Sequence, residues 1–259
     1  MSPDISNTSL LFLLVFVFVP LTLSYYYQLG LKKDIIWSSL RGTVQLFLIG
    51  YALTYLFDLP PLVGIPLMLT IMLLVASFHA RKKGAGIPNV LLTILLGLVL
   101  IEGSVLSLWL VADMIEFTPS EVIPMSGMVI GNSMVAMGLA LDRMKSEFKE
   151  NKGRILAALA LGATPNQSSK LLIKQTLNAS LIPNVDKLKT IGLVQLPGMM
   201  TGLILGGVEP VIAIKYQLVI SLSIFSAVTL STIFVTLMSY RYFYNDRMQL
   251  IDMGTETSS

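Results

Sequence analysis

Residues 87–111 read IPNVLLTILLGLVLIEGSVLSLWLV, an apolar run interrupted by a single charged residue, Glu102. The hydrocarbon core of a bilayer is about 30 Å thick, and a helix needs about 20 mostly apolar residues to cross it. Runs of comparable length and polarity recur from one end of the chain to the other. The sequence therefore predicts an all-α integral membrane protein.

Composition excludes most soluble enzymes and several kinds of metal site. Of 259 residues, 54% are hydrophobic and 13% are charged, whereas about a quarter of a soluble domain is charged. The chain has no cysteine and one histidine, His79, which excludes disulfides, thiolate ligands and a multi-histidine cluster within one chain. The net charge of +3 comes from basic residues in loops beside apolar runs, which indicates membrane topology and gives no reason to expect nucleic acid.

Seven apolar stretches predict seven transmembrane helices. The first has a leader that contains Asp4 and no basic residue, so we expect it to stay in the protein and not to be cleaved as a signal peptide. The predicted spans are residues 9–27, 41–57, 62–78, 87–111, 122–141, 190–208 and 217–240.

The distribution of basic residues predicts the orientation of these spans. All but Lys215 of the 18 Lys and Arg residues fall in the loops after the first, third and fifth spans or in the C-terminal tail. Because loops rich in Lys and Arg stay in the cytoplasm, we expect the N-terminus outside and the C-terminus in the cytoplasm.

The long cytoplasmic segment between the fifth and sixth spans, residues 142–189, has the pattern of two helices with a break. Residues 154–163 are rich in Ala and Leu, which favour helix. Gly162 can end that helix, Thr164 can cap the next, and Pro165 suits its first position. We expect the second helix to end near Pro183.

Two stretches combine a proline with glycines four residues apart. Gly198, Gly202 and Gly206 recur in the predicted sixth span, and Gly127 and Gly131 in the fifth. In lipid, faces of small residues let helices approach closely, so the two motifs are candidates for packing against each other. Ordinary helix contact without a role in transport explains the same pattern.

Several polar and thioether side chains are candidates for a transport path. Asn132 and Met199 are predicted near mid-membrane, and Met125, Met128 and Asn132 share one helical face. Met200 neighbours Met199, and Gln45 is a polar residue inside the second span. A methionine and amide lining suits a soft or borderline cation, although methionine also fills irregular cores.

Glu102 is the only acidic residue well inside a predicted span. A carboxylate at that depth is costly, about 2.5 to 3.5 kcal/mol on insertion scales, and such groups usually face a cavity or a partner. Glu102 is therefore a candidate for contact with a cation or a proton. The alternative is a carboxylate near the outer rim that water reaches because Gly103 and Ser104 loosen the helix.

The stretch Leu156-Ala157-Ala158-Leu159-Ala160-Leu161-Gly162 resembles the A-A-x-x-x-G core of the loop by which permeases of ATP-binding cassette (ABC) transporters dock onto their ATPases. Blocks spread over nearly the whole chain are similar to the FetB family, and residues 196–202 are the most specific of them. The blocks are residues 35–37, 44–46, 123–132, 161–164, 196–202 and 213–217.

The FetB resemblance implies a single permease domain over residues 1–259, with Ala157, Ala158, Gly162, Thr164 and Pro165 in the ATPase-coupling loop. It implies seven spans in a bacterial inner or plasma membrane and a separate FetA-like ATPase that binds ATP and Mg²⁺. It also implies export of iron and resistance to oxidative stress, whereas plant relatives imply aluminium tolerance or a nucleotide sugar as cargo. No metal-ligand assignment follows from the family.

The residues are consistent with a permease that is not itself an enzyme. The chain has no G-x-x-x-x-G-K-[ST] phosphate loop, so we expect no cofactor and no catalytic residue in it. Seven spans are few for one translocation path, so we expect two copies with two ATPases. The alternatives are an ATP-independent secondary transporter, a scaffold subunit without cargo, and a retinal protein, which the absence of a lysine in residues 217–240 disfavours.

Overall fold

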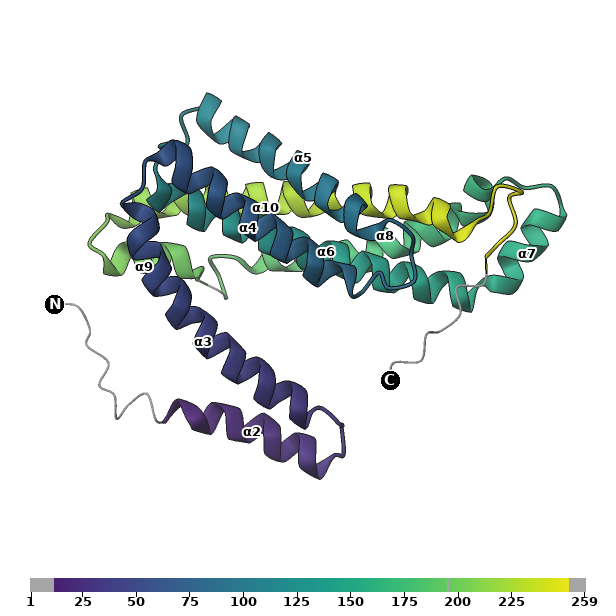
Figure 1. Cartoon of the computed structure of the whole chain (residues 1–259), viewed down its shortest axis with the longest axis horizontal. Helices are drawn as coiled ribbons and strands as arrows, with labels where there is room; N and C mark the ends of the chain where they lie inside the picture. Colours follow the sequence, from purple (N-terminus) through teal and green to yellow (C-terminus); the bar gives the residue numbers. More distant parts are fainter. Residues whose placement is uncertain (1–11, 195, 252–259) are drawn as a thin grey trace. The chain divides into compact units, whose positions relative to one another are not determined.

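The computed structural model describes residues 12–194 and 196–251, and these residues are almost entirely helical (Figure 1). Within that part of the chain there is no β-strand, only an isolated antiparallel bridge between Tyr244 and Leu250. The predicted all-α class is confirmed. The chain divides between Pro60 and Pro61 into two compact units, which are described separately below.

The first unit is a pair of helices, α2 (Leu13–Tyr26) and α3 (Lys32–Phe57), which pack against each other. Gln28 and Gly30 take positive φ angles in the short connection and turn the chain between the helices. The predicted first span corresponds to α2, and its residues 9–11 lie outside the described residues. The second span is longer than predicted, because α3 already begins at Lys32.

The second unit is a helical bundle with α6 (Pro119–Glu150) at its centre. α6 packs most extensively on α10 (Pro210–Ser239) and also contacts α4 (Pro61–Arg81) and α5 (Val90–Val111). A 3₁₀ turn, η1 (Tyr240–Phe243), follows α10. At about 1.5 Å per residue, the 32 residues of α6 extend well beyond the thickness of a bilayer core.

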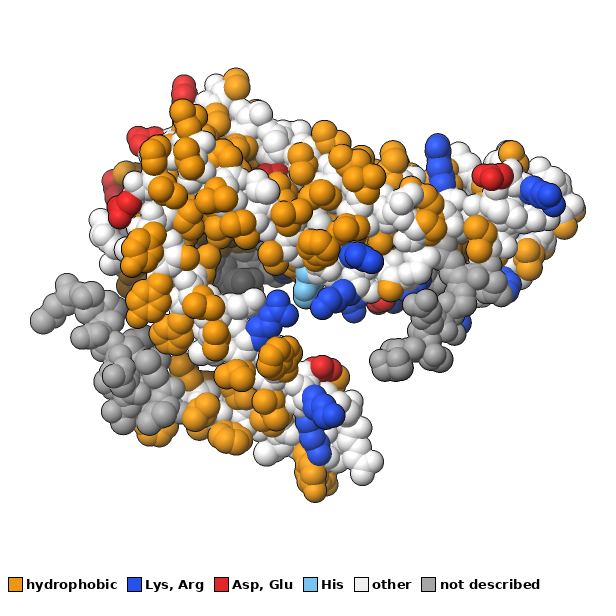
Figure 2. Space-filling model, viewed as in Figure 1, with side chains coloured by type: hydrophobic (Ala, Val, Ile, Leu, Met, Phe, Trp, Pro, Cys, Tyr) orange, Lys and Arg blue, Asp and Glu red, His pale blue; other side chains and the backbone are white. Residues whose placement is uncertain are grey.

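The sides of this bundle are apolar and its ends are charged, as a membrane-spanning bundle requires. Figure 2 shows hydrophobic side chains over the region of α4 and α5, with basic side chains gathered toward the end that carries α7 (Lys152–Ala160). Asp113 and Glu116 lie in the connection from α5 to α6, and Glu121 lies in the first turn of α6, at the other end of that helix from α7. Leu62 and Val111 are 79% and 84% exposed, which is costly in water and favourable in lipid.

The bundle interior is held by close helix contacts and few cross-helix hydrogen bonds. The indole Nε1 of Trp109 donates to the hydroxyl of Ser223 at 2.8 Å and ties α5 to α10. A Cβ added at Gly97 would lie 2.7 Å from Cδ1 of Phe234 and 2.8 Å from Cε of Met137, so α5 approaches α6 and α10 more closely there than a larger residue allows. Small residues at such contacts are typical of membrane helices.

The predicted helix break after the fifth span is confirmed in detail. α7 ends at Ala160, and Gly162 follows with a φ of +86°, a conformation that glycine adopts at no steric cost. α8 (Pro165–Thr190) begins with Pro165 at its first turn, and Thr164 is its cap. The Thr164 hydroxyl accepts from the backbone N–H of Gln167, and the Gln167 side-chain oxygen accepts from the backbone N–H of Thr164.

The predicted end of the second helix near Pro183 is wrong, because α8 continues to Thr190 with Pro183 inside it. Proline removes one backbone hydrogen bond, but packing of α8 against both α6 and α10 keeps the helix intact. Its buried stripe repeats at helical spacing and is made of Ser169, Leu172, Ile173, Thr176 and Ser180. Residues 142–189 therefore include a helix that lies against two long helices of the bundle (Figure 1).

The predicted continuous sixth span over residues 190–208 is also wrong. α8 ends at Thr190, and the next helix, α9 (Gly198–Leu205), has only 8 residues. Gly192 has a φ of +80°, and Pro197 is the extended cap of α9, so both residues depart from the helical conformation.

Five described helices are long and apolar enough to cross a membrane: α3, α4, α5, α6 and the helix from Pro210 to Phe243. α2 is a shorter apolar helix. These six correspond to six of the seven predicted spans, with ends displaced by several residues in α3, α6 and α10. The orientation of the bundle stays a prediction.

Candidate functional site

Glu102 is buried in the second unit, on the face of α5 that meets the rest of the bundle. Its side chain is only 3% exposed, and within the described part of the chain neither carboxyl oxygen has a hydrogen-bond partner. The hydroxyl of Ser126, on α6, is the polar group beside it, without the geometry of a hydrogen bond. The alternative of a water-accessible carboxylate near the rim does not fit this burial.

Met125, Met128 and Asn132 share a helical face of α6 as expected, but their surroundings differ. Met125 is 1% exposed and forms part of the core, next to Ser126. Met128 and Asn132 are half-buried, and the Asn132 amide donates to the backbone oxygen of Met128 at 2.8 Å. Core filling explains Met125, whereas Met128 and Asn132 lie where the second unit leaves α6 partly uncovered.

Gly127 and Gly131 of α6 are half-buried, like Met128 and Asn132. A Cβ at Gly127 would be in ordinary contact with Met72 of α4, at 3.4 Å from its Cε, and a Cβ at Gly131 would meet nothing within 4 Å. Val135, one turn further along, is 62% exposed. Gly131 and Asn132 thus belong to an open face of α6.

Met199 and Met200 lie in the first turn of α9 and are both half-buried. Gly198 and Gly202 are exposed, and a Cβ at either would meet nothing within 4 Å. Gly206 is the cap that ends α9, and only backbone oxygens of its own turn lie close to it. α9 packs on α10, so the structure does not bring its glycines against Gly127 and Gly131.

Gln45 is an exposed residue of α3 in the first unit. Gln45 is therefore in a different unit from the other path candidates, of which Glu102 and Met125 are buried and Met128, Asn132, Met199 and Met200 are half-buried. No group of three or more His, Cys, Asp or Glu side chains that could hold a metal ion occurs in residues 12–194 and 196–251.

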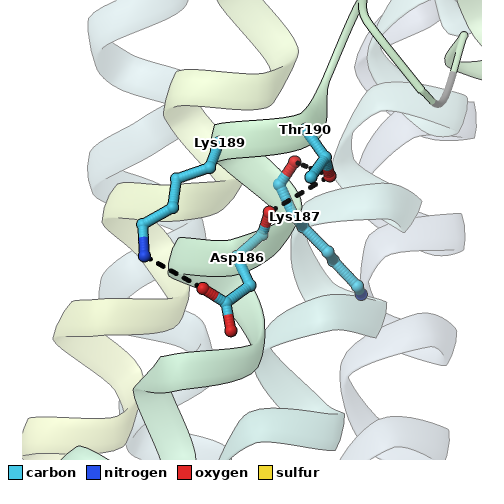
Figure 3. Close-up of polar contacts among 4 residues, drawn as sticks. All are labelled: Asp186, Lys187, Lys189 and Thr190. Carbon is cyan, nitrogen blue, oxygen red and sulfur yellow. Dashed lines mark hydrogen bonds and ion pairs between the residues drawn. The ribbon is translucent and has the colours of Figure 1, made fainter.

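The C-terminal end of α8 carries a small polar cluster beside the helix break (Figure 3). The ammonium of Lys189 lies 3.0 Å from a carboxylate oxygen of Asp186, and both side chains are mostly exposed. The hydroxyl of Thr190 donates to the backbone oxygens of Asp186 and Lys187, at 3.1 and 3.2 Å. The single hydroxyl proton is shared between these two carbonyls in the last turn of α8.

The segment predicted to couple to an ATPase forms an exposed apolar surface. We call it the α7 surface and define it by Leu156, Ala157, Ala158 and Leu161. Leu161 is 90% exposed and Leu156 46% exposed, whereas Ile155, on the other side of α7, is completely buried. Ala157 is exposed and Ala158 half-buried. Gly162, Thr164 and Pro165 form the turn that holds this surface at the end of the bundle.

Sequence reasoning missed two sets of polar contacts. Ser126 was not predicted as the neighbour of Glu102, since nothing in the order of residues pairs α5 with α6 at that level. Tyr244 was not predicted to bond with Ser168 and Ser169, at 2.9 and 2.6 Å, because the contact joins residues far apart in the chain. An isolated serine inside an apolar run was the only signal for Ser126.

A sequence model of the uncharacterised protein family UPF0014 matches residues 7–244. The chain is 40% identical to the Escherichia coli K12 protein named "Probable iron export permease protein FetB", over 96% of each chain. It is 37% identical to the Bacillus subtilis 168 UPF0014 membrane protein YjkA, over 93% of this chain and 97% of that one.

A plant relative matches over most of its length as well. The Arabidopsis thaliana protein ALUMINUM SENSITIVE 3 is 34% identical, over 92% of this chain and 87% of that one. No solved structure matches. Together with the apolar helices, these matches make the chain a multi-pass membrane protein related to permeases.

Proposed function

The chain belongs to the UPF0014 family of membrane permeases, and we propose that it is the membrane-spanning subunit of an ABC transporter that exports iron or a related metal ion. The observation that carries the proposal is the α7 surface. Leu161 is 90% exposed and lies at the charged end of the bundle, where lipid tails do not cover it. Exposed apolar patches of this kind are typical of protein–protein contacts.

The partner is a separate FetA-like subunit that binds ATP and Mg²⁺. This chain has no phosphate-binding loop of its own, so an energised pump needs a second polypeptide. The assembly contains two permeases and two ATPases related by a twofold axis, as is usual for symmetric complexes. The open face of α6 around Gly131 and Asn132 is a candidate for contact between the two copies.

The α7 end of the bundle lies in the cytoplasm. The N-terminus lies outside, in agreement with the basic residues around α7 and the acidic residues at the other end. The sixth crossing is made by the C-terminal part of α8 together with α9, with a break in the helix at Gly192 and Pro197. Non-helical backbone at membrane depth is tolerated only where protein or a water-filled path covers it, so this break belongs to the protein interior of the assembled transporter.

Transport follows from movement at the α7 surface. When ATP closes the two ATPases, the load on α7 reaches α6 and α8, which pack against it. Separation of α5 from α6 would open Glu102 and Ser126 to the path. Met128, Asn132, Met199 and Met200 would then provide weak, exchangeable contacts for a cation that has shed part of its hydration.

The experiment that tests this function is uptake of radioactive ferrous iron into inside-out vesicles that hold the chain with its co-expressed ATPase. Export from the cytoplasm corresponds to accumulation inside such vesicles. We expect accumulation with ATP, none without it, and none when the ATPase carries an inactive Walker A lysine. A proton-gradient uncoupler should have no direct effect.

Two other results would replace the proposal. Accumulation that persists without ATP and collapses with the uncoupler would indicate a secondary transporter. A folded complex that hydrolyses ATP but accumulates no iron would keep the ABC permease and reject iron as its cargo. Aluminium, other metals and nucleotide sugars would then be tested as cargo in the same vesicles.

A further inference from the structure

The last helix and the first turns of α8 meet at a buried cluster that the proposed function has not used. It consists of Phe148, Ser168, Ser169, Phe243 and Tyr244, and we call it the latch. Phe148 is at the end of α6, the serines are near the start of α8, and Phe243 and Tyr244 directly follow α10. Three elements therefore converge on five side chains.

The hydroxyl of Tyr244 is the centre of the latch. It lies 2.9 Å from Oγ of Ser168 and 2.6 Å from Oγ of Ser169. Ser168 also donates to the backbone oxygen of Pro165 at 3.0 Å, which uses its only proton. Tyr244 then donates to Ser168 and accepts from Ser169, so all three hydroxyls are satisfied.

Aromatic contacts join the same tyrosine to α6. The rings of Phe148 and Phe243 stack with centroids 4.1 Å apart, and Phe148 meets the Tyr244 ring edge-on at 6.1 Å. Phe148 and Phe243 are each 3% exposed and Tyr244 8%. Breaking one of these buried hydrogen bonds would leave a polar group unpaired. The ring contacts add packing between the same elements, so we expect the cluster to resist deformation.

The chain after Tyr244 is folded back so that the latch keeps its position. The side-chain oxygen of Asn245 accepts from the backbone N–H groups of Arg247 and Gln249, at 3.0 and 2.8 Å. The N–H of Ile251 donates to the backbone oxygen of Phe243 at 2.8 Å. The segment that carries Phe243 and Tyr244 is thus a closed turn and not a free tail.

We propose that the Tyr244 latch is the element that transmits movement of the ATPase-docking helices to α10. The inference rests on the proposed function, since it assumes that an ATPase docks on α7. The capped turn at Thr164 joins α7 to α8, and the hydroxyl of Tyr244 is hydrogen-bonded to Ser169 of α8 directly after that turn. α8 also packs along α10, but the hydroxyl of Tyr244 supplies the hydrogen bonds that join the start of α8 to the segment after α10, and we expect movement of α8 to reach α10 less strongly without them.

The test is the variant Tyr244→Phe in the complex with the co-expressed ATPase. This change keeps the ring and its contacts with Phe148 and removes both hydrogen bonds to α8. Tyr242→Phe is the matched control, because Tyr242 is half-buried two residues earlier and makes no hydrogen bond through its side chain in the described part of the chain. Ser169→Ala removes one bond from the other side.

The readout is amide hydrogen exchange of α7 and α10 with and without a non-hydrolysable ATP analogue. In the wild type and in Tyr242→Phe, nucleotide should change exchange in both helices. In Tyr244→Phe the change in α7 should persist, and the change in α10 should fall at least fivefold. ATP hydrolysis should stay within about twofold, and combining Ser169→Ala with Tyr244→Phe should add little, since both remove one network.

Two other outcomes would contradict the latch, and a third would contradict the proposed function on which it rests. An α10 response in Tyr244→Phe equal to that of the wild type would refute the latch. A parallel loss of both responses and of folded complex would also refute it, because the cluster would then serve stability alone. A wild-type complex in which nucleotide changes neither helix would overturn the proposed function, and the latch with it.

Discussion

A carboxyl group buried without a hydrogen-bond partner is the most informative feature at the scale of single residues. Burial of such a group costs free energy that packing elsewhere must offset, and an apolar residue of similar size would be more favourable at that place. Glu102 is held in this position by the tight packing of α5 on α6 and α10. A costly residue that is nevertheless present points to function, which is the reason to place it on the proposed path.

We therefore expect Glu102→Leu to stabilise the protein and to inactivate it. The free energy of unfolding should rise by about 1 to 3 kcal/mol, because an unsatisfied carboxyl group is replaced by an apolar side chain. The measurement is the thermal midpoint of the purified protein in detergent, together with ATP-dependent iron accumulation in vesicles. Accumulation should fall to the level seen without ATP.

Glu116→Leu is the control for this prediction. Glu116 is exposed in the connection before α6, so its replacement should leave stability within about 0.5 kcal/mol and transport unchanged. A lower thermal midpoint in Glu102→Leu than in Glu116→Leu would mean that the carboxyl group has a partner in the folded protein.

At the scale of elements, a close approach at one glycine determines how α5 packs against its neighbours. α5 meets α6 and α10 at Gly97, where the neighbouring side chains leave no room for a Cβ, and Trp109 fixes the other end of α5 on α10. A single residue without a side chain thus sets the distance among three helices.

Gly97→Ala should weaken this contact measurably. The new methyl group must displace the ring of Phe234 or the end of Met137, which we expect to cost about 1 to 3 kcal/mol of unfolding free energy. Gly103→Ala, on the same helix but with nothing within 4 Å, should be neutral or stabilising by up to about 1 kcal/mol, since alanine favours helix. Thermal unfolding of both variants in one detergent is the measurement, and equal midpoints would contradict the tight contact.

At the scale of the whole molecule, the α7 surface makes the assembly with an ATPase testable. Leu161→Glu should reduce the amount of ATPase that copurifies with the chain at least tenfold, because a tenfold change needs only about 1.4 kcal/mol and an unpaired buried carboxylate costs more. The wild-type complex should contain two copies of each subunit, measured by native mass spectrometry.

Leu59→Glu serves as the control for the docking prediction. Leu59 is an exposed leucine in the turn between α3 and α4, next to Asp58, so a charge there should not affect recovery of the ATPase. Equal loss of the ATPase in both variants would point to a general effect of charge. Full recovery with Leu161→Glu would place the docking site elsewhere.

The order of residues was enough to predict the class, most of the spans and the turn at Gly162, Thr164 and Pro165. These features depend on local chemistry: run length against bilayer thickness, and residues that end or cap a helix. Gly192 and Pro197 carry the same kind of signal for the break before α9. Because both residues lie in an apolar stretch of spanning length, the sequence predicts one continuous helix through them.

The length of α8, the enclosure of Glu102 and the latch at Tyr244 depend on which helices become neighbours. Packing on α6 and α10 carries α8 past Pro183, and the hydroxyl of Ser169 reaches that of Tyr244 across a long chain separation. Contacts between distant segments leave no periodic mark in a sequence, because in an apolar helix nearly every face can be buried or can meet lipid.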